Sequence, residues 1–205
     1  MQTVAIVPIK ALTAAKTRLA AVLTPPERAA LTVRVLRNVL AALDQPEITA
    51  RVVISPDETV LDEARAAGAV ALRQRDGGLN EGLEQARAWA LAAGADAILV
   101  VLGDLPLLAQ EDVAALLDLA EYPRSVVFAP DRHGAGTNAL LLRPADAFPY
   151  AFGEGSLARH RAAAAAHGLV PRFYDAAGTA LDLDTPADLA ALDALLSGAG
   201  AGVLR

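Results

Sequence analysis

The chain has 205 residues, no cysteine and a formal net charge of −6 at pH 7. This length allows one α/β domain with a sizeable core, and the acidic balance argues against a nucleic-acid partner. The lack of cysteine excludes disulfide bonds and thiolate metal sites. The sequence does not begin with a basic region and an apolar signal core, and no apolar run reaches membrane-spanning length. We therefore expect a cytoplasmic protein without a signal peptide or a membrane partner.

The first half of the chain predicts strands and helices in alternation. Strands are expected at Thr3–Pro8, Arg51–Ile54, Ala69–Leu72 and Ile98–Leu102. The first helix has Thr24 as its N-cap, Pro25 at its first position and Glu27 three residues after the cap. Further helices are expected from Ser55-Pro56-Asp57-Glu58 to about Ala67, over Glu81–Ala93, and near Glu111–Leu119.

The second half of the chain predicts shorter elements. Strands are expected at Ser125–Ala129, Ala139–Arg143, Arg172–Tyr174 and Ala180–Leu183, and helices at Leu157–His167 and from the Thr185 cap to about Ser197. The tail Gly198–Arg205 is expected to fray. The whole pattern predicts a single domain over residues 1–205, with an α/β fold of three layers around a mostly parallel sheet.

The central strand ends at a candidate ligand site. Five apolar residues, Ile98–Leu102, lead directly into Gly103-Asp104, and such a short apolar run fits a strand buried on both faces. A glycine here lets the backbone turn tightly or approach a ligand closely. Open α/β sheets bind ligands beyond the carboxyl ends of their strands, where Asp104 is expected. Taken alone, Asp104 is better explained as the cap of a turn.

Two further carboxylates alternate with leucines in Leu181-Asp182-Leu183-Asp184. If this segment is extended, Asp182 and Asp184 share one face. Together with Asp104 they would form a set of hard oxygen ligands that suits Mg²⁺. They could equally be solvated edge residues, with Asp184 helping to cap the next helix.

A basic loop follows the first strand and contains Lys10, Lys16 and Arg18. At the carboxyl edge of a sheet these cations could hold a triphosphate and stabilise a leaving pyrophosphate. A solvated basic loop is the alternative. The loop lacks the glycines of a P-loop or of a dinucleotide-binding fingerprint.

Three predicted loops that contain glycine, Arg75–Asn80, Pro130–Asn138 and Phe152–Ser156, could contact substrates. Phe152–Ser156 opens a helix, so its N–H groups and the Ser156 hydroxyl could hold a phosphate or carboxylate, with Thr137 donating to the same anion. Gly78 and Asn80 could approach and read a base. Ordinary turns, with Ser156 and Asn80 as helix caps, are the alternative. The three histidines, His133, His160 and His167, are expected to be surface or cap residues.

The ordered set of these motifs resembles the guanylyltransferases of deazaflavin coenzyme F-420 biosynthesis. It comprises Val7-Pro8-Ile9-Lys10, Ala15-Lys16-Thr17-Arg18-Leu19, Gly78-Leu79-Asn80, Gly103-Asp104-Leu105-Pro106, Gly136-Thr137-Asn138, Phe152-Gly153-Glu154-Gly155-Ser156 and Leu181-Asp182-Leu183-Asp184-Thr185-Pro186. No single motif is decisive, but the order is specific and the resemblance covers nearly the whole chain.

The resemblance implies a fold like that of nucleotide-diphospho-sugar transferases, which is Rossmann-like. It implies transfer of GMP from GTP to the phosphate of phosphoenolpyruvate, as in bacterial members, or of 2-phospho-L-lactate, as in archaeal ones. The implied phospho-acid site is Thr137, Gly153 and Ser156, and the implied Mg²⁺ site is Asp104, Asp182 and Asp184. Lys10, Lys16 and Arg18 would clamp the triphosphate and act with Asp104 in catalysis, while Gly78 and Asn80 would lie on the guanine side.

The attacking group in that reaction would be a phosphate oxygen, which is largely ionised at neutral pH and needs no general base. Competing interpretations are another nucleotidyltransferase and a catalytically silent nucleotide-binding module. Many other nucleotidyltransferases have a glycine-rich loop after the first strand, where this chain has Lys10-Ala11-Leu12-Thr13. Coupling to a downstream transferase that consumes the product is a further expectation.

Overall fold

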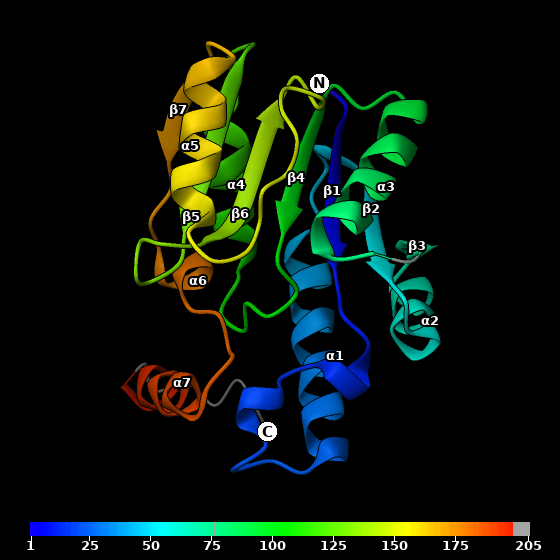
Figure 1. Ribbon diagram of the computed structural model, residues 1–205, viewed down its shortest axis with the longest axis vertical. Coiled ribbons are helices and arrows are strands. Elements are labelled where there is room, and N and C mark those ends of the chain that lie inside the picture. Colours follow the sequence, from blue (N-terminus) through cyan, green and yellow to red (C-terminus); the bar gives the residue numbers. More distant parts are fainter. Residues whose placement is uncertain (76, 199–205) are drawn as a thin grey trace.

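A computed structural model describes residues 1–75 and 77–198 of the chain. These residues form a seven-stranded sheet in the order β3-β2-β1-β4-β6-β5-β7 (Figure 1). The strands are β1 (Thr3–Pro8), β2 (Ile48–Ser55), β3 (Val70–Arg73), β4 (Ala97–Val101), β5 (Ser125–Pro130), β6 (Thr137–Arg143) and β7 (Val170–Phe173). Neighbouring strands are parallel except where β6 pairs with β4 and β5. The predicted α/β fold with a mostly parallel sheet is confirmed.

Helices cover both faces of this sheet, as three layers require (Figure 1). The helices are α1 (Pro25–Ala42), α2 (Glu58–Ala66), α3 (Leu79–Ala92), α4 (Gln110–Leu119), α5 (Ser156–Ala166), α6 (Ala177–Ala180) and α7 (Pro186–Gly198), and two 3₁₀ turns, Leu12–Ala14 and Thr17–Leu19, follow β1. One hydrophobic core includes residues of α1, α2 and α4, and the other includes residues of α3 and α5. The two cores therefore lie on opposite faces.

Strand β4 contributes to both cores because successive side chains point to opposite faces. Leu99 and Val101 pack with α1 and α4, whereas Ile98 and Val100 pack with α3 and α5. All four side chains are fully buried. The apolar run that predicted a central strand therefore reflects burial on both faces.

The predicted start of α1 is confirmed by its hydrogen bonds. Glu27 accepts from the backbone N–H of Thr24 at 2.7 Å, and Pro25 is the first helical residue. In the next helix the cap is Asp57, whose side chain accepts from Thr59 N–H at 3.0 Å, while Ser55 ends β2.

One predicted strand is wrong. Residues Ala177–Ala180 form the short helix α6, and residues 181–184 then cross the end of the sheet without joining it. The Asn138 side chain donates to the carbonyls of Thr179 and Ala180, so the backbone there is satisfied without a strand partner. The predicted alternation of buried and more exposed residues is still observed, because Leu181 and Leu183 are buried while Asp182 and Asp184 are only partly buried. The tail that was predicted to fray lies, from residue 199 on, outside the described residues, as does Asp76 in the predicted 75–80 loop.

Gly103 is required by side-chain packing. A Cβ at this position would lie 2.0 Å from Cδ1 of Ile9 and 3.2 Å from Cγ1 of Val7. We expect Gly103→Ala to lower the free energy of unfolding by about 1–3 kcal/mol, because the buried Ile9 must move. Urea unfolding measures this loss. Ile9→Val removes the clashing atom, so the double variant should recover most of it, and a double variant no better than Gly103→Ala would contradict this account.

Candidate active site

The topology brings three chain segments to one edge of the sheet. Strands β1 and β4 are parallel, so Lys10 and Asp104 follow strands that end at the same edge. Strand β6 runs the opposite way, with Ala139 paired to Val101, so its first residue, Thr137, lies at this edge too. This is the edge at which open α/β sheets bind ligands.

Residues 181–184 lie beside Asp104. The sequence alone could not establish this proximity. The N–H of Leu183 donates to the backbone carbonyl of Asp104 at 3.0 Å. Burial, and then the nearby Asp104 carboxylate, raise the pKa of Asp182 above its usual range. The acidic residues therefore gather close enough to repel one another, and a cation would stabilise them.

Lys16 already supplies one positive charge to this cluster. Its ammonium nitrogen lies 3.4 Å from Oδ2 of Asp104 and 3.4 Å from Oδ1 of Asp184, and its side chain is only 5% exposed. The Lys16 backbone is left-handed, with φ of 53°, at the turn that directs the side chain inward. Of the three predicted cations, Lys16 is thus the one that contacts the acidic residues.

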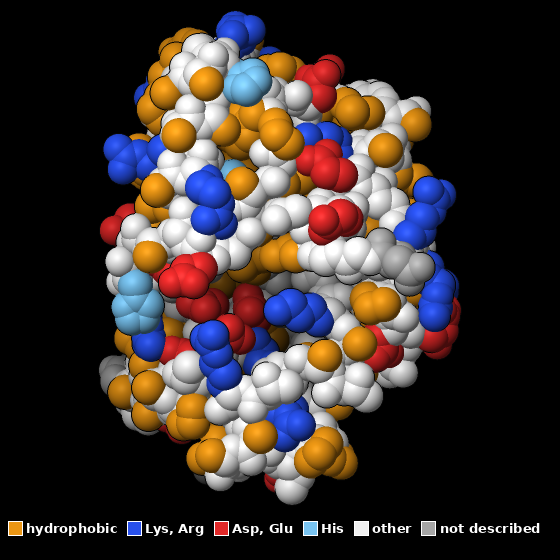
Figure 2. All heavy atoms as spheres, in the orientation of Figure 1, with side chains coloured by type: hydrophobic (Ala, Val, Ile, Leu, Met, Phe, Trp, Pro, Cys, Tyr) orange, Lys and Arg blue, Asp and Glu red, His pale blue; other side chains and the backbone are white. Residues whose placement is uncertain are grey.

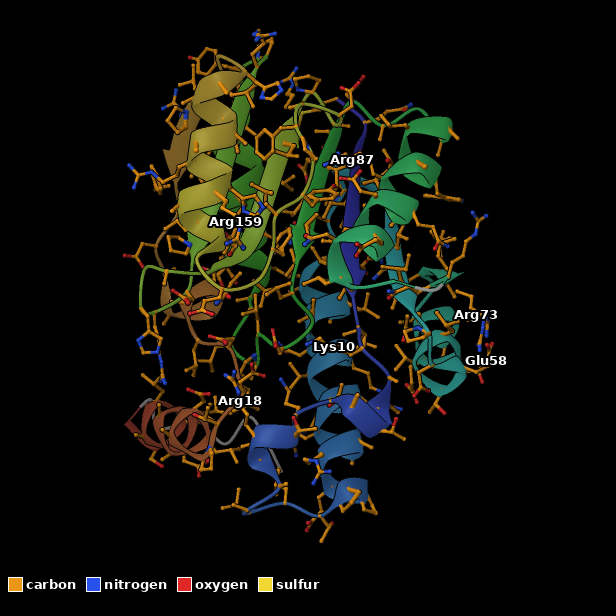
Figure 3. The ribbon with its side chains drawn as sticks, in the orientation of Figure 1. Lys10, Arg18, Glu58, Arg73, Arg87 and Arg159 are labelled. Carbon is orange, nitrogen blue, oxygen red and sulfur yellow. The ribbon has the colours of Figure 1, made fainter. Side chains whose placement is uncertain are left out.

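Lys10 and Arg18 remain exposed, and neither forms an ion pair with another residue in the described part of the chain. Figure 2 shows acidic side chains within a hollow in the middle of the molecule, with basic side chains around it. In the same orientation, Figure 3 shows Lys10 and Arg18 beside this hollow. The two cations are therefore placed to meet an anionic ligand that enters it.

The predicted Mg²⁺ site is not preassembled. Among residues 1–75 and 77–198, no three acidic or histidine side chains stand together closely enough to hold a metal. Lys16 takes the position between Asp104 and Asp184. However, Oδ1 of Asp104 is buried and has no hydrogen-bond partner among the described residues. An unsatisfied carboxylate oxygen beside further carboxylates suits Mg²⁺, which takes oxygen ligands and completes its shell with phosphates.

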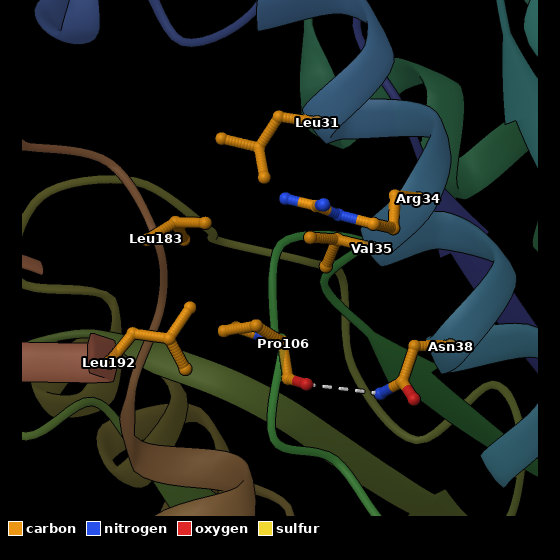
Figure 4. A pocket seen from close by; sticks show the side chains of 7 residues that line it. All are labelled: Leu31, Arg34, Val35, Asn38, Pro106, Leu183 and Leu192. Carbon is orange, nitrogen blue, oxygen red and sulfur yellow. Dashed lines mark hydrogen bonds between the residues drawn. The ribbon is translucent and has the colours of Figure 1, made fainter. Parts of the chain in front are cut away.

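The acidic segments pack against α1 around a small apolar pocket of about 20 Å³ (Figure 4). Leu183, which lies between the two aspartates, and Pro106 line it together with Leu31 of α1. Asn38 of α1 donates to the carbonyls of Pro106 and Leu108 at 3.2 and 3.0 Å. The sequence reasoning missed Asn38, because nothing near it in the sequence indicates its distant partners.

Asp188, which belongs to the cap predicted at Thr185, also holds the end of the acidic segment. Its carboxylate accepts from the N–H of Asp184 and from the hydroxyl of Thr185, each at 2.9 Å, and pairs with Arg132. Burial alone would raise the pKa of Asp188, but the hydrogen bonds from Thr185 and Asp184 and the charge of Arg132 lower it overall. The acid after Thr185-Pro186 is the kind of signal that marks such a cap.

The predicted phospho-acid residues are brought together. The backbone N–H of Thr137 donates to the Ser156 hydroxyl at 2.9 Å. Gly153 and Gly155 have φ values of 115° and 67°, which favour glycine and let the loop turn into α5. Gly155 is the N-cap and Ser156 the first helical residue. The Ser156 hydroxyl is therefore not used as a cap and faces the Thr137 backbone.

The prediction that His160 is a surface or cap residue is wrong. Its side chain is fully buried, because α5 packs this face against the 148–152 segment. One ring nitrogen lies 3.1 Å from Oγ1 of Thr137, and the other accepts from Ala151 N–H at 3.0 Å. Burial, and then the charge of Arg159, lower the pKa of His160 to about 4. The ring is therefore neutral at pH 7. His133 and His167 are exposed, as predicted.

Gly78 is the N-cap of α3 and Asn80 lies in the first turn of this helix. The Glu81 side chain, rather than that of Asn80, completes the cap by accepting from Gly78 N–H at 3.0 Å. The Asn80 amide pairs with the backbone of Phe152. Phe152 N–H donates to Oδ1 at 2.8 Å, and Nδ2 donates to the Phe152 carbonyl at 3.2 Å. One amide hydrogen and one lone pair of Asn80 stay free for a base, so the guanine-side assignment stays a prediction.

Comparison with known proteins identifies the family. The model of the family described as "Guanylyl transferase CofC like" matches residues 3–202. The chain belongs to this guanylyltransferase family. A phosphoenolpyruvate guanylyltransferase of Rubrobacter xylanophilus is 48% identical over 194 residues, which cover 95% of each chain. A 2-phospho-L-lactate guanylyltransferase of Methanothermobacter thermautotrophicus is 39% identical, over 92% of this chain and 83% of that one.

A nucleotide-diphospho-sugar transferase structure from Desulfovibrio desulfuricans G20 shares the fold, with a TM-score of 0.74 and 20% identity over 96% of this chain and 88% of that one. The predicted resemblance, the fold class and the nucleotidyltransferase class of enzyme are thus confirmed. No helix within residues 1–75 and 77–198 is long and apolar enough to cross a membrane.

Proposed function

We propose that this guanylyltransferase transfers GMP from GTP to the phosphate of phosphoenolpyruvate, giving enolpyruvyl-diphospho-guanosine and pyrophosphate. The observation that carries the proposal is the meeting of two sets of groups at one sheet edge. One set is the charged cluster of Lys16, Asp104 and Asp184, and the other is the Thr137–Ser156 pair. Asn138, the neighbour of Thr137, links them by holding the carbonyl of Ala180, which lies two residues before Asp182.

In the proposed reaction a phosphate oxygen of the phospho-acid attacks the α-phosphorus of GTP. The new P–O bond forms as the bond from the α-phosphorus to the bridging oxygen breaks, and pyrophosphate carries the electron pair away. This step needs two anions aligned and their charge neutralised, with no proton removed from the nucleophile. The fully buried, neutral His160 and the absence of cysteine agree with chemistry that uses no side-chain base.

Each group then has a proposed role. Lys10, Lys16 and Arg18 bind the triphosphate and stabilise the leaving pyrophosphate. Asp104, with Asp182 and Asp184, would hold Mg²⁺, which when bound supplies positive charge to the phosphates. Thr137, Gly153 and Ser156 bind the phospho-acid, and Gly78 and Asn80 lie on the guanine side. Lys16 would exchange one or both carboxylates for phosphate oxygens when the metal and GTP are present.

The name of the 48% identical relative favours phosphoenolpyruvate as the acceptor. 2-Phospho-L-lactate is the second candidate, because a 39% identical relative is named for it. The two acids carry the same phosphate and carboxylate, so the same contacts serve both. Coenzyme F-420 biosynthesis in the cytoplasm, with a downstream transferase that consumes the product, completes the proposal.

The proposal is tested by following the GMP group. [α-³²P]GTP is incubated with the protein, Mg²⁺ and phosphoenolpyruvate, and the products are separated on an anion-exchange column. The expected result is a new labelled anion formed in equal amount to pyrophosphate and only with the phospho-acid present. Label that remains in GTP, or appears only as GMP, would contradict transfer.

Ser156→Ala removes one proposed donor to the phospho-acid. We expect KM for phosphoenolpyruvate to rise about tenfold or more, since a hydrogen bond to a charged group is worth about 1.5–3 kcal/mol. KM for GTP should stay within about twofold. Ser125→Ala is the matched control, because Ser125 is equally buried but bonds to Tyr122 O at the start of β5. A rise in KM for GTP instead would show that the loop binds the nucleotide.

A further inference from the structure

We infer that His160 is a positioning residue, which fixes the Thr137 hydroxyl as a hydrogen-bond donor to the bound phospho-acid. This inference rests on the proposed function, because that proposal places the phospho-acid at Thr137, Gly153 and Ser156. His160 would lie behind the ligand and act on it through Thr137.

The hydrogen bonds determine which ring nitrogen carries the proton. Nε2 of His160 lies 3.0 Å from the backbone nitrogen of Ala151. A backbone N–H can only donate, so Nε2 must be the unprotonated acceptor of a neutral ring. The single proton of that ring is then on Nδ1. Burial, which lowers the pKa of His160 to about 4, keeps the ring in this neutral form at pH 7.

The Nδ1 proton in turn sets the direction of the Thr137 hydroxyl. Nδ1 lies 3.1 Å from Oγ1 of Thr137 and donates to it. The Thr137 hydroxyl therefore uses a lone pair toward His160 and keeps its own proton. No other residue among 1–75 and 77–198 forms a hydrogen bond with Oγ1, although Thr137 is only 2% exposed.

The Ser156 hydroxyl, which lies beside Thr137, is in the same situation. Its hydroxyl oxygen accepts from Thr137 N–H at 2.9 Å, its exposure is 2%, and its proton has no acceptor in the described part of the chain. Each of the two buried hydroxyl groups thus has a proton with no acceptor, and burying an unpaired donor costs free energy. An oxyanion, which only accepts, is the ligand that satisfies both.

The backbone that directs His160 is itself held in place. Arg159, the neighbour of His160 on α5, donates to the carbonyl of Ala151 from Nη2 at 2.9 Å and from Nε at 3.2 Å. The backbone of Ala151 is therefore bonded to α5 through both its N–H and its carbonyl. The Phe152 ring packs edge-on against the His160 ring, with centroids 4.8 Å apart. His160 has little freedom to turn over and present the other nitrogen.

The tautomer is tested directly on the wild-type protein. A long-range ¹H–¹⁵N spectrum at pH 7 distinguishes protonated from unprotonated ring nitrogens, and His133→Gln and His167→Gln identify the remaining His160 signals. We expect a protonated Nδ1 and an unprotonated Nε2. A ring protonated on Nε2 alone, or on both nitrogens, would overturn the inference whatever the enzymatic activity.

Two substitutions then separate the two hydrogen bonds of the ring. His160→Gln can place an oxygen near the Nε2 position and accept from Ala151, but it removes the donor to Thr137. His160→Asn can place its amide N–H near the Nδ1 position and keep that donor. We expect His160→Gln to raise KM for phosphoenolpyruvate about tenfold, with KM for GTP unchanged, and His160→Asn to raise it less.

Thr137→Val completes the test as a double-mutant cycle. If His160 acts through the hydroxyl, His160→Gln should add less than twofold to KM for phosphoenolpyruvate in the Thr137→Val background. Equal rises in both backgrounds, or equal rises for both substrates, would leave His160 a merely structural residue. If Thr137→Val itself leaves that KM unchanged, the phospho-acid site of the proposed function is wrong, which is a separate result from a wrong tautomer.

Discussion

Asp104→Asn is expected to lower kcat by at least about a hundredfold, which is the usual cost of removing one charge-stabilising group from an active site. The substitution keeps the volume of the side chain and removes its charge. It thereby takes away a proposed Mg²⁺ ligand and one of the two carboxylates that Lys16 contacts at 3.4 Å. Pyrophosphate release at saturating GTP and phosphoenolpyruvate measures the loss.

The fold should tolerate Asp104→Asn. Asp104 lies close enough to raise the pKa of Asp182, so neutralising it relieves repulsion between the two carboxylates. It also removes one of the two carboxylates that pair with the buried Lys16, so the two effects oppose each other and the melting temperature should change little. Asp118→Asn, at an exposed position on α4, is the control and should change neither quantity. Turnover at the wild-type rate in Asp104→Asn would refute the proposed role of this carboxylate.

Lys16→Met is expected to reduce both activity and stability. Its stem keeps much of the buried volume, but the ammonium group between Asp104 and Asp184 is lost. Removing one partner of a buried ion pair costs about 3–5 kcal/mol. The partners here are 27% and 42% exposed, which screens the charges and reduces the expected loss to about 1–2 kcal/mol.

The catalytic effect of Lys16→Met should exceed the effect on stability. With one cation gone, the pyrophosphate that leaves is less well stabilised, and kcat should fall about a hundredfold. Urea unfolding and pyrophosphate release measure the two effects on one preparation. Lys16→Arg keeps the charge and should recover more of the stability than of the activity. A Lys16→Met enzyme that is as stable as the wild type would show that the ammonium group does not hold the acidic cluster.

The sequence predicts well where the fold repeats simple patterns. The apolar run Ile98–Leu102 identified a strand buried on both faces, and Thr24 with Glu27 identified the start of α1. These signals are local, because periodicity and capping depend on residues within one or two turns of each other. For the same reason, Leu181–Asp184 alternated like a strand and misled the prediction of structure there.

The site was harder to predict because its contacts connect residues far apart in the chain. Lys16 lies close to Lys10 and Arg18 in the sequence, but only the folded chain brings it to Asp104 and Asp184. His160 lies on a helix with almost no apolar periodicity, where alanines surround it, so its burial leaves no sequence signal. Asn38 likewise donates to the carbonyls of Pro106 and Leu108, which lie near it only in space.

The central claim is that GMP passes from GTP to the phosphate of phosphoenolpyruvate. The most direct measurement is pyrophosphate release from GTP and Mg²⁺ with phosphoenolpyruvate, 2-phospho-L-lactate and 3-phosphoglycerate in parallel. The downstream transferase and its deazaflavin acceptor are included to remove the product. We predict release with phosphoenolpyruvate and little with the other two acids. Release with none of the three, from a folded protein that still binds GTP, would contradict the claim, and release with 2-phospho-L-lactate alone would reassign the acceptor.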